Sequence, residues 1–442
     1  MKKISIIILI CFIFETCSSS FGADNVFLVN PTSLRTQVLS KNISLLEALR
    51  NVQNSKLNVS LARAKLLPSI NLSVLLPALA SPTFLVSSVT FLFPFLVPSN
   101  WMVLKQQSEL LESDKAAYDA LQLNILSNSL SLYFTYLNDQ KTQVIFSNLS
   151  ETLGILYSRL KKQSDVLGNV SIEDLGMASA QWEESKIKSS KLLQLLIEEK
   201  AGLRTLLGLP LGSKMNIEDF DLSPSLYESK TVYEIADHSL KVAPESLQLD
   251  FLIKAATSGK FAKFFGFMSS ATIFGTSFNN ASPFSLLKTS GGFTFGMDNL
   301  VNFQIANNNI ESVKLRMQQL KFENERTSEI LVGEINEVKS QQVMSGNALR
   351  DRLSVYNAQK REYAIGLISL QTLLQTQVQL TDSYVANIKS ELDLKMQRLT
   401  LMRLVIDGDF SKIKRCKTTL VPSRKTKIFR RDKGNSLDEV CR

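Results

Sequence analysis

Apolar residues recur at steps of three to four positions along two long stretches of this chain, and polar residues fill the positions between them. The clearest runs are Leu121, Ile125, Leu132 and Tyr136, then Leu149, Leu153, Leu156 and Leu160, and later Leu367, Leu370, Leu374 and Val378. This spacing predicts amphipathic helices with a narrow apolar stripe, as in coiled coils. A long helix with so narrow a stripe cannot bury itself alone, so we expect these helices to associate side by side.

The two stretches are copies of one unit. The first begins at Asn100 and the second at Asn299, and a glycine interrupts each at a matching depth, at Gly168 and Gly366. Neither stretch contains proline. At a rise of ~1.5 Å per residue, a helix from Asn100 to Gly168 is roughly 100 Å long. We therefore expect an internal repeat of two long helical hairpins, each turning at its glycine.

The segment before each long helix has a different pattern. In the first copy it contains Val89, Phe91, Phe93, Phe95 and Val97 in alternation, and in the second Phe293 and Phe295 beside glycines. Several prolines in the first copy exclude a membrane-spanning helix there, whereas runs of about ten residues suit the strands of a membrane β-barrel. Four strands cannot close a barrel, but three chains would supply twelve. The alternative is a buried β-hairpin in a soluble domain.

These patterns predict an α+β membrane protein, with long coiled-coil helical hairpins in two internal repeats and four β-strands per chain that contribute to a trimeric 12-stranded β-barrel. We expect a signal peptide at 1–22, an N-terminal extension at 23–41, two repeats at 42–228 and 229–411, and a basic, poorly ordered tail at 412–442. The first repeat is expected to contain a leading helix at 42–65, a β-hairpin at 69–97, a long helix at 100–166 and a return helix at 171–207. The second repeat is expected to contain the same elements at 231–260, 261–297, 299–365 and 369–407.

The N-terminus has the pattern of a secretory signal. Lys2 and Lys3 precede an apolar run that is too short to anchor the chain in a bilayer, and small residues follow up to Gly22. Cys17 is preceded by a poor lipidation motif, so its modification stays open. We expect an exported protein without an inner-membrane helix.

Charge is concentrated at the C-terminal end. The formal net charge of the chain is +9, and most of it lies between Lys412 and Arg442. An exported chain rarely meets nucleic acid, so we expect no nucleic-acid partner; anionic lipid headgroups, peptidoglycan or simple disorder are the alternatives. Cys416 and Cys441 form either a disulfide or two free thiols.

Catalytic chemistry finds no support in the sequence. The one histidine, His238, lies on a predicted helix, where a satisfied or solvent-facing role is the simplest interpretation. Phosphate-binding loops, His/Cys metal clusters and nucleophile motifs do not occur. We therefore expect no enzyme, no cofactor and no metal.

Taken together, the order and spacing of several motifs resemble the TolC-like outer membrane efflux proteins. The resemblance rests on Ser44 to Leu49, Ala62 to Pro68, Arg159 to Gly168 with Ser171 and Asp174, Leu206 to Gly208, and in the second copy Ala236, Pro244, Glu245 and Tyr363 to Gly366. It covers residues 40 to 410. It implies a homotrimer with a barrel in the outer membrane, a helical tunnel in the periplasm, a mixed α/β region around 209–230 and after 408, and partners that are a periplasmic adaptor and an inner-membrane pump.

The same resemblance directs attention to the hairpin turns, because members of this family close the tunnel at its periplasmic tip, often with a ring of acids. In this chain the positions of those acids hold Thr372 and Gln375, and Glu173 and Asp174 are the nearest carboxylates. The plainer interpretation of both acids is a solvated first turn that favours the helix dipole. The tip and pore residues that we single out are Gly168, Glu173, Asp174, Gly366, Ser369, Thr372 and Gln375.

The function expected from this resemblance is passive conduction from the periplasm to the exterior, in a tripartite efflux or type I secretion system and gated at the helical tip. The alternative is a non-conducting periplasmic coiled-coil scaffold. Cargo, pump and adaptor stay open, because partners select the cargo in such systems.

Overall fold

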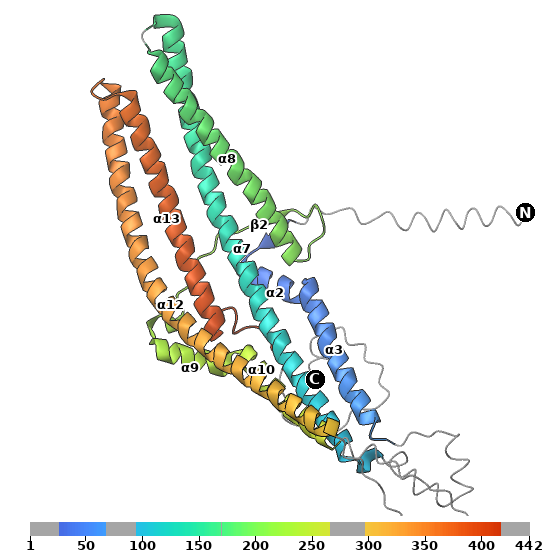
Figure 1. Ribbon diagram of the computed structural model, residues 1–442. Helices are drawn as coiled ribbons and strands as arrows, with labels where there is room; N and C mark the ends of the chain where they lie inside the picture. Colours follow the sequence, from blue (N-terminus) through green and yellow to red (C-terminus); the bar gives the residue numbers. More distant parts are fainter. Residues whose placement is uncertain (1–25, 68–93, 169, 266–296, 417–442) are drawn as a thin grey trace, which may run out of the picture.

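Two long helical hairpins stand side by side and turn at the same end of an elongated molecule (Figure 1). The computed structural model describes residues 26–67, 94–168, 170–265 and 297–416. The hairpins are formed by α7 (Pro98–Leu167) with α8 (Ile172–Leu206), and by α12 (Met297–Ala364) with α13 (Leu370–Val405). Because α8 packs on α7, α7 on α13 and α13 on α12, the four helices form one row.

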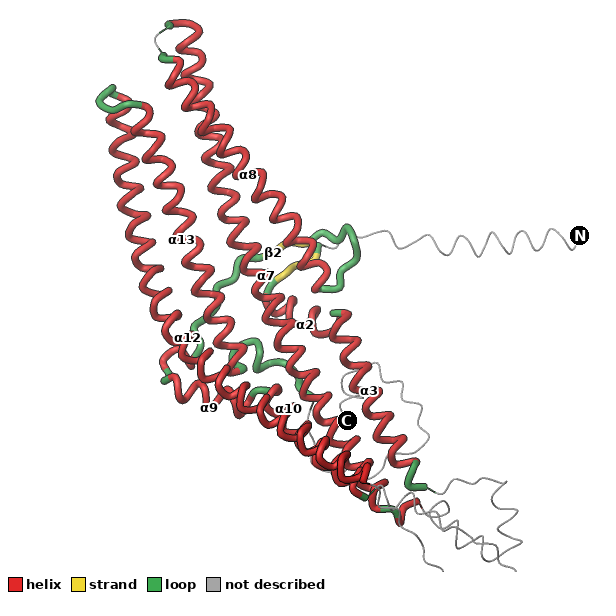
Figure 2. The backbone as a smooth tube through the Cα atoms, viewed as in Figure 1, coloured by secondary structure: helices red, strands yellow, loops and turns green. Residues whose placement is uncertain are grey.

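Shorter helices continue the row at the opposite end of the molecule (Figure 2). Here α3 (Ile43–Ala64) packs on α7, and α10 (Pro244–Phe264) lies between α7 and α12. The end of α8 and the start of α3 are joined by a hydrogen bond of 3.3 Å from Asn42 Nδ2 to the carbonyl of Leu206. The row therefore has two edges, one formed by α8 and α3 and the other by α12.

Two helices lead into each repeat. The single helix expected over 42–65 is confirmed as α3, whereas the helix expected over 231–260 is broken in two. α2 (Pro31–Lys41) occupies part of the expected N-terminal extension and precedes α3, and α9 (Val232–Val242) precedes α10. The first repeat therefore begins about ten residues earlier than the sequence pattern predicted.

Single residues with extended backbone make these breaks. Asn42 ends α2 and caps α3, because its side-chain oxygen accepts hydrogen bonds from the amides of Ser44 and Leu45. Ala243 takes the same place in the second repeat, and Pro244 follows it as the first residue of α10, a position that needs no amide hydrogen.

The described residues also correct the limits of the expected β-hairpins. Phe95 lies in the 3₁₀ helix η1 (Pro94–Leu96) rather than in a strand, and α10 runs through Phe264, beyond the expected start of the second hairpin at residue 261. The side chain of Trp101 donates a hydrogen bond of 2.7 Å to the carbonyl of Phe95, which fixes this turn on α7. Phe91, Phe93, Phe293 and Phe295 lie outside the described residues.

A belt of short elements crosses the row at mid-height. β1 (Phe27–Val29) pairs in parallel with β2 (Met215–Ile217), and η2 (Leu226–Ser229) follows in the same connection. The largest apolar core of the described chain lies beneath this belt and includes Tyr133, Leu203 and Phe410. Among the described helices, none combines the length and apolar character needed to cross a bilayer.

The segment after α13 is ordered farther than the expected tail boundary at residue 412. Ile413 and Cys416 are buried, the first in the core under the belt and the second against α3 and α7. The amide of Cys416 donates a hydrogen bond of 2.9 Å to Asp119 Oδ1 of α7, and burial raises the pKa of that carboxyl to about 7. Cys416 is disulfide-bonded, and its partner cysteine lies outside the described residues.

A chain that ends after Phe410 loses these contacts, whereas one that ends after Cys416 keeps them. We expect the shorter chain to be less stable by about 2 kcal/mol or more, since it no longer buries Ile413 and loses the hydrogen bond to Asp119. Urea unfolding of both chains and the full chain under reducing conditions measures the difference without a contribution from the disulfide. Equal midpoints for the two truncated chains would refute a structural role for residues 411 to 416.

Candidate functional site at the hairpin tips

Each hairpin turns at a glycine in the left-handed region of backbone conformation. φ is +61° at Gly168 and +78° at Gly366, values that side chains with a Cβ rarely adopt. The return helices then begin with matching caps, because the hydroxyl of Ser171 accepts from the amide of Asp174 at 2.9 Å and that of Ser369 from the amide of Thr372 at 3.2 Å. The two tips are thus built alike.

Apolar side chains join the two hairpins just below the tips. The buried members of this tip cluster are Leu153, Leu160, Ala178, Leu370 and Leu374, with Leu175, Tyr157, Trp182 and Tyr363 packed around them. They come from all four long elements, so the first hairpin contacts the second at the end where both turn. Separating the hairpins would expose this cluster to water.

A polar contact accompanies the apolar one. Burial raises the pKa of the Tyr363 phenol on α12, and the carboxylate of Asp174 on α8 raises it further. Asp174 is therefore close to the second hairpin although it belongs to the first. The half-buried state of Asp174 agrees with this position.

The other residues singled out from the sequence are distributed around the tips. Thr372 is half-buried, and its hydroxyl lies 3.0 Å from that of Ser369, so this pair belongs to the helix cap. Glu173 and Gln375 are exposed. The structure therefore brings Asp174 to the facing hairpin, while Glu173 and Gln375 point to solvent at the level of the single chain.

Trp182 was missed by the sequence analysis, although it organises the first hairpin. Its indole stacks on Tyr157 with ring centroids 5.4 Å apart, and Lys186 Nζ lies 4.0 Å from the ring centre. A Cβ at Gly154 would lie 2.9 Å from the indole nitrogen, so the glycine makes room for the ring. A lone tryptophan opposite a glycine in a helical repeat is the signal that could have found this contact.

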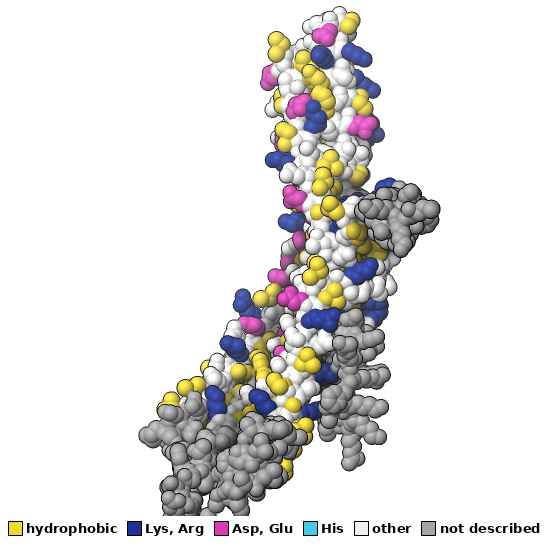
Figure 3. Space-filling view, turned by 90° about the vertical axis from the view of Figure 1, so that its right-hand side faces the viewer, with side chains coloured by type: hydrophobic (Ala, Val, Ile, Leu, Met, Phe, Trp, Pro, Cys, Tyr) yellow, Lys and Arg dark blue, Asp and Glu magenta, His cyan; other side chains and the backbone are white. Residues whose placement is uncertain are grey.

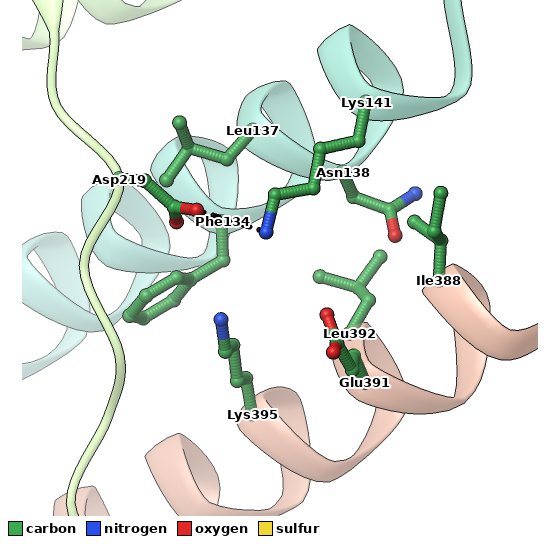
Figure 4. A pocket seen from close by; sticks show the side chains of 9 residues that line it. All are labelled: Phe134, Leu137, Asn138, Lys141, Asp219, Ile388, Glu391, Leu392 and Lys395. Carbon is green, nitrogen blue, oxygen red and sulfur yellow. Dashed lines mark ion pairs between the residues drawn. The ribbon is translucent and has the colours of Figure 1, made fainter. Parts of the chain in front are cut away.

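At mid-height, a small charged cavity lies where α7, α13 and the segment after β2 meet (Figure 4). Lys141 Nζ lies 2.9 Å from Asp219 Oδ2, and this hydrogen bond lowers the pKa of Asp219. Lys395 reaches Asp221 at 3.6 Å. With a volume of about 10 Å³ the cavity has room for one water molecule at most, so it is a joint between belt and shaft rather than a ligand site.

The second hairpin is fastened to the belt by a buried acid. Glu228 of η2 accepts from Arg398 Nε of α13 at 2.9 Å and pairs with Lys339 Nζ of α12 at 2.7 Å. Burial raises the pKa of Glu228, but the bonds from Lys339 and Ser225 and the charge of Arg398 outweigh it, so the pKa is lowered overall. Glu228 therefore links both α12 and α13 to the belt.

His238 has a structural partner. Its Nε2 lies 3.0 Å from the hydroxyl of Tyr227, and the two rings are 4.9 Å apart. Nowhere in the described part of the chain do three His, Cys, Asp or Glu side chains gather as a metal ion would require. Along the shaft, basic, acidic and apolar side chains are interspersed on the face shown in Figure 3.

Comparison with solved structures shows what this arrangement is similar to. A membrane protein from Pseudomonas aeruginosa matches with a TM-score of 0.66 at 12% sequence identity, over 87% of this chain and 95% of the other. The Campylobacter jejuni CmeC outer membrane channel matches with a TM-score of 0.65 at 14% identity, over 86% and 88% of the two chains. The open state of the Neisseria gonorrhoeae MtrE outer membrane channel gives a TM-score of 0.60 at 13% identity, over 85% and 88%.

No protein-family model and no curated protein matches the sequence. The chain has the TolC-like fold of outer membrane efflux channels, which confirms the resemblance for the helical hairpins. The four barrel strands stay a prediction, because their segments lie largely outside the described residues.

Proposed function

We propose that this protein is the outer membrane channel of a tripartite efflux or type I secretion system, a passive conduit from periplasm to exterior that is gated at its periplasmic helical tip. The TolC-like fold over most of the chain supports this proposal. CmeC and MtrE, which share this fold, are outer membrane channels, and we propose the same role for this protein.

The observation that carries the proposal is the apolar character of the two edges of the helix row. On α3 the exposed apolar residues are Ile43, Leu46, Leu57 and Leu61, whose exposed fractions range from 45% to 76%. Their steps of three, eleven and four residues keep them on one face, opposite the residues that pack on α7, such as Leu45 and Val52. An exposed apolar edge of this kind indicates that another chain packs against the row.

The opposite edge has the same character. On α12 the exposed apolar residues along the outer side include Val301, Ile305, Leu315, Phe322 and Ile330. The buried residues Ile310 and Leu331 lie on the other side of this helix. A second copy of the chain that places its α3 and α8 against this α12 would cover both edges, and three copies would close a ring around a tunnel.

The membrane part and the partners follow from the same proposal. At the end of the row opposite the tips, α3 and α10 end and α7 and α12 begin, and the segments expected as β-hairpins lie between them in the sequence. We assign them to the 12-stranded barrel in the outer membrane lipid. The tips then point into the periplasm, where a periplasmic adaptor and an inner-membrane pump would bind.

The proposal is tested by membrane fractionation followed by reconstitution. We expect a homotrimer that requires detergent for extraction from the outer membrane and forms ion-conducting pores in planar bilayers. A monodisperse, water-soluble monomer would instead favour the alternative, a non-conducting periplasmic coiled-coil scaffold.

The tip composition gives a second test. Thr372 and Gln375 stand where the resemblance leads us to expect acids, so Thr372→Asp with Gln375→Asp would add a ring of three or six carboxylates to a narrow tunnel. We expect higher cation selectivity and block by divalent cations from the tip side, since the ring focuses the field. Replacing Asn51 and Asn58 of α3 by Asp adds the same charge far from the tip and serves as the control. Unchanged selectivity in the tip variant would remove both positions from the constriction.

A further inference from the structure

Two aromatic side chains and a lysine lie on one broad face of the helix row, at the end opposite the hairpin tips. Here α10 ends and α7 begins (Figure 1). Trp101, Lys105 and Glu109 follow one another at steps of four residues along one ridge of α7. The hydroxyl of Ser258 on α10 donates a hydrogen bond of 2.7 Å to Glu109 Oε2, and Phe261 lies one turn after Ser258. Trp101, Lys105 and Phe261 therefore share one face, and we call this group the basal collar.

The aromatic rings of the basal collar are exposed to solvent. Trp101 is 50% exposed and Phe261 is 43% exposed. The indole Nε1 of Trp101 donates its hydrogen bond to the carbonyl of Phe95 at 2.7 Å, so the exposed part of the ring is apolar. Because α7 lies between α3 and α10 inside the row, copies that cover the two edges in the proposed ring leave Trp101 uncovered. The basal collar therefore fits a partner other than a neighbouring copy.

The end of the row that carries the basal collar has an excess of positive charge. Residues 61–67, 94–108 and 255–265 contain no Asp or Glu and five Lys or Arg, namely Arg63, Lys65, Lys105, Lys260 and Lys263. The start of α12, residues 297–310, adds one acid and no base. At the tip of the first hairpin the two signs are balanced, since residues 159–175 contain three basic and three acidic residues. A partner of the basal collar is therefore expected to be anionic.

We propose that the basal collar binds the anionic phospholipid headgroups of a membrane surface and marks the level at which the helical shaft meets that membrane. Aromatic rings favour the headgroup level of a bilayer, and basic side chains beside them attract anionic lipid. The same pairing recurs between α10 and α12, where Lys260 Nζ lies 4.1 Å from the centre of the Phe303 ring. The inference rests on the proposed channel function, which places this end of the shaft next to the outer membrane.

The two tryptophans of the chain can each report contact with lipid, because one lies at the base of α7 and the other near the tips. Trp182→Phe leaves Trp101 as the single reporter at the basal collar, and Trp101→Phe leaves Trp182 as the reporter of the tip. Both full-length variants are reconstituted in bilayers of phosphatidylglycerol whose acyl chains carry bromine next to the headgroup, since bromine quenches indole emission on contact. We expect the emission to fall several-fold for Trp101 and to stay unchanged for Trp182.

The preference for anionic lipid is measured in bilayers of phosphatidylglycerol mixed with an equal amount of phosphatidylcholine, with the bromine on one lipid or on the other. Trp101 should be quenched more strongly when phosphatidylglycerol carries the bromine. Lys105→Glu reverses the charge beside the ring and should remove this difference. Lys161→Glu is the matched control, because Lys161 is an exposed lysine at the first tip, and it should keep the difference.

Emission of Trp101 that bromine leaves unchanged in a conducting trimer would overturn the basal collar and leave the channel function standing, because the ring would then face the water of the tunnel or another chain. Equal quenching by the two brominated lipids would overturn the anionic partner. A chain that neither enters the bilayer nor conducts would refute the channel function, and this inference with it.

Discussion

Replacing Leu57 and Leu61 with glutamate should convert the protein from a trimer to a folded monomer and abolish conduction. Both side chains are more than half exposed on the edge of α3 that faces away from α7, so their loss does not disturb the chain's own core. In the proposed ring they would be buried against the α12 edge of the next copy. Each buried leucine contributes about 1.5 to 3 kcal/mol, and a carboxylate in its place adds a desolvation cost.

Mass measurement in detergent gives the oligomeric state of the variant, and circular dichroism shows whether its helices are still folded. Asn51→Glu with Asn58→Glu is the matched control, because both asparagines are exposed on a flank of the same helix. The control should stay trimeric. If the leucine variant also remains a conducting trimer, the α3 edge is not an interface and the ring is built in another way.

The second large effect concerns the tips. Leu370→Asp with Leu374→Asp should part the two hairpins and raise single-channel conductance several-fold, since both leucines are buried in the tip cluster that joins them. Their burial accounts for about 3 to 6 kcal/mol of contact between the hairpins. The loss of this much contact free energy is enough to shift a gate from mostly closed to mostly open.

Leu367→Asp provides the control for the tip, because Leu367 lies on the same turn and is 71% exposed. It should conduct as the unmodified protein does. Conductance that rises equally in both variants would attribute the effect to charge near the tip. Conductance that rises in neither would show that the tip cluster does not hold the tunnel closed.

Helix periodicity predicted the shaft well, because its signal is local. Leu153, Leu160, Leu370 and Leu374 stand in the apolar stripes that the sequence pattern marked, and all four are buried in the tip cluster. The glycines at 168 and 366 could be placed at the turns for the same reason, since the left-handed backbone that ends a helix is a local requirement. Leu367, in the same stripe, is exposed and lies in the turn before α13 begins.

The breaks and the belt could not be predicted in this way. α2 has little amphipathic pattern of its own, and Leu34 and Val38 are buried only because the core under the belt lies beside them. The pairing of β1 with β2 joins strands of three residues that are distant in sequence, and such short strands carry almost no periodic signal. Pro244 was visible, but a proline inside a helical pattern also suits a kink, and only the extended backbone at Ala243 shows a break.

The candidate site was predicted in outline and not in its contacts. The turns followed from the glycine spacing. Asp174 beside Tyr363 joins residues of different repeats, and no pattern along one helix reveals which helix will face it.

The hydrogen bond from Cys416 to Asp119 spans 297 positions along the chain. A segment that is synthesised later thus completes the environment of a helix that is synthesised much earlier. Contacts of such long sequence separation form late and slowly, because the whole intervening chain must be arranged first. Until this contact forms, the apolar side chains of α3 and α7 that pack around Cys416 stay open to water, so contact with other unfolded chains is favoured during that interval.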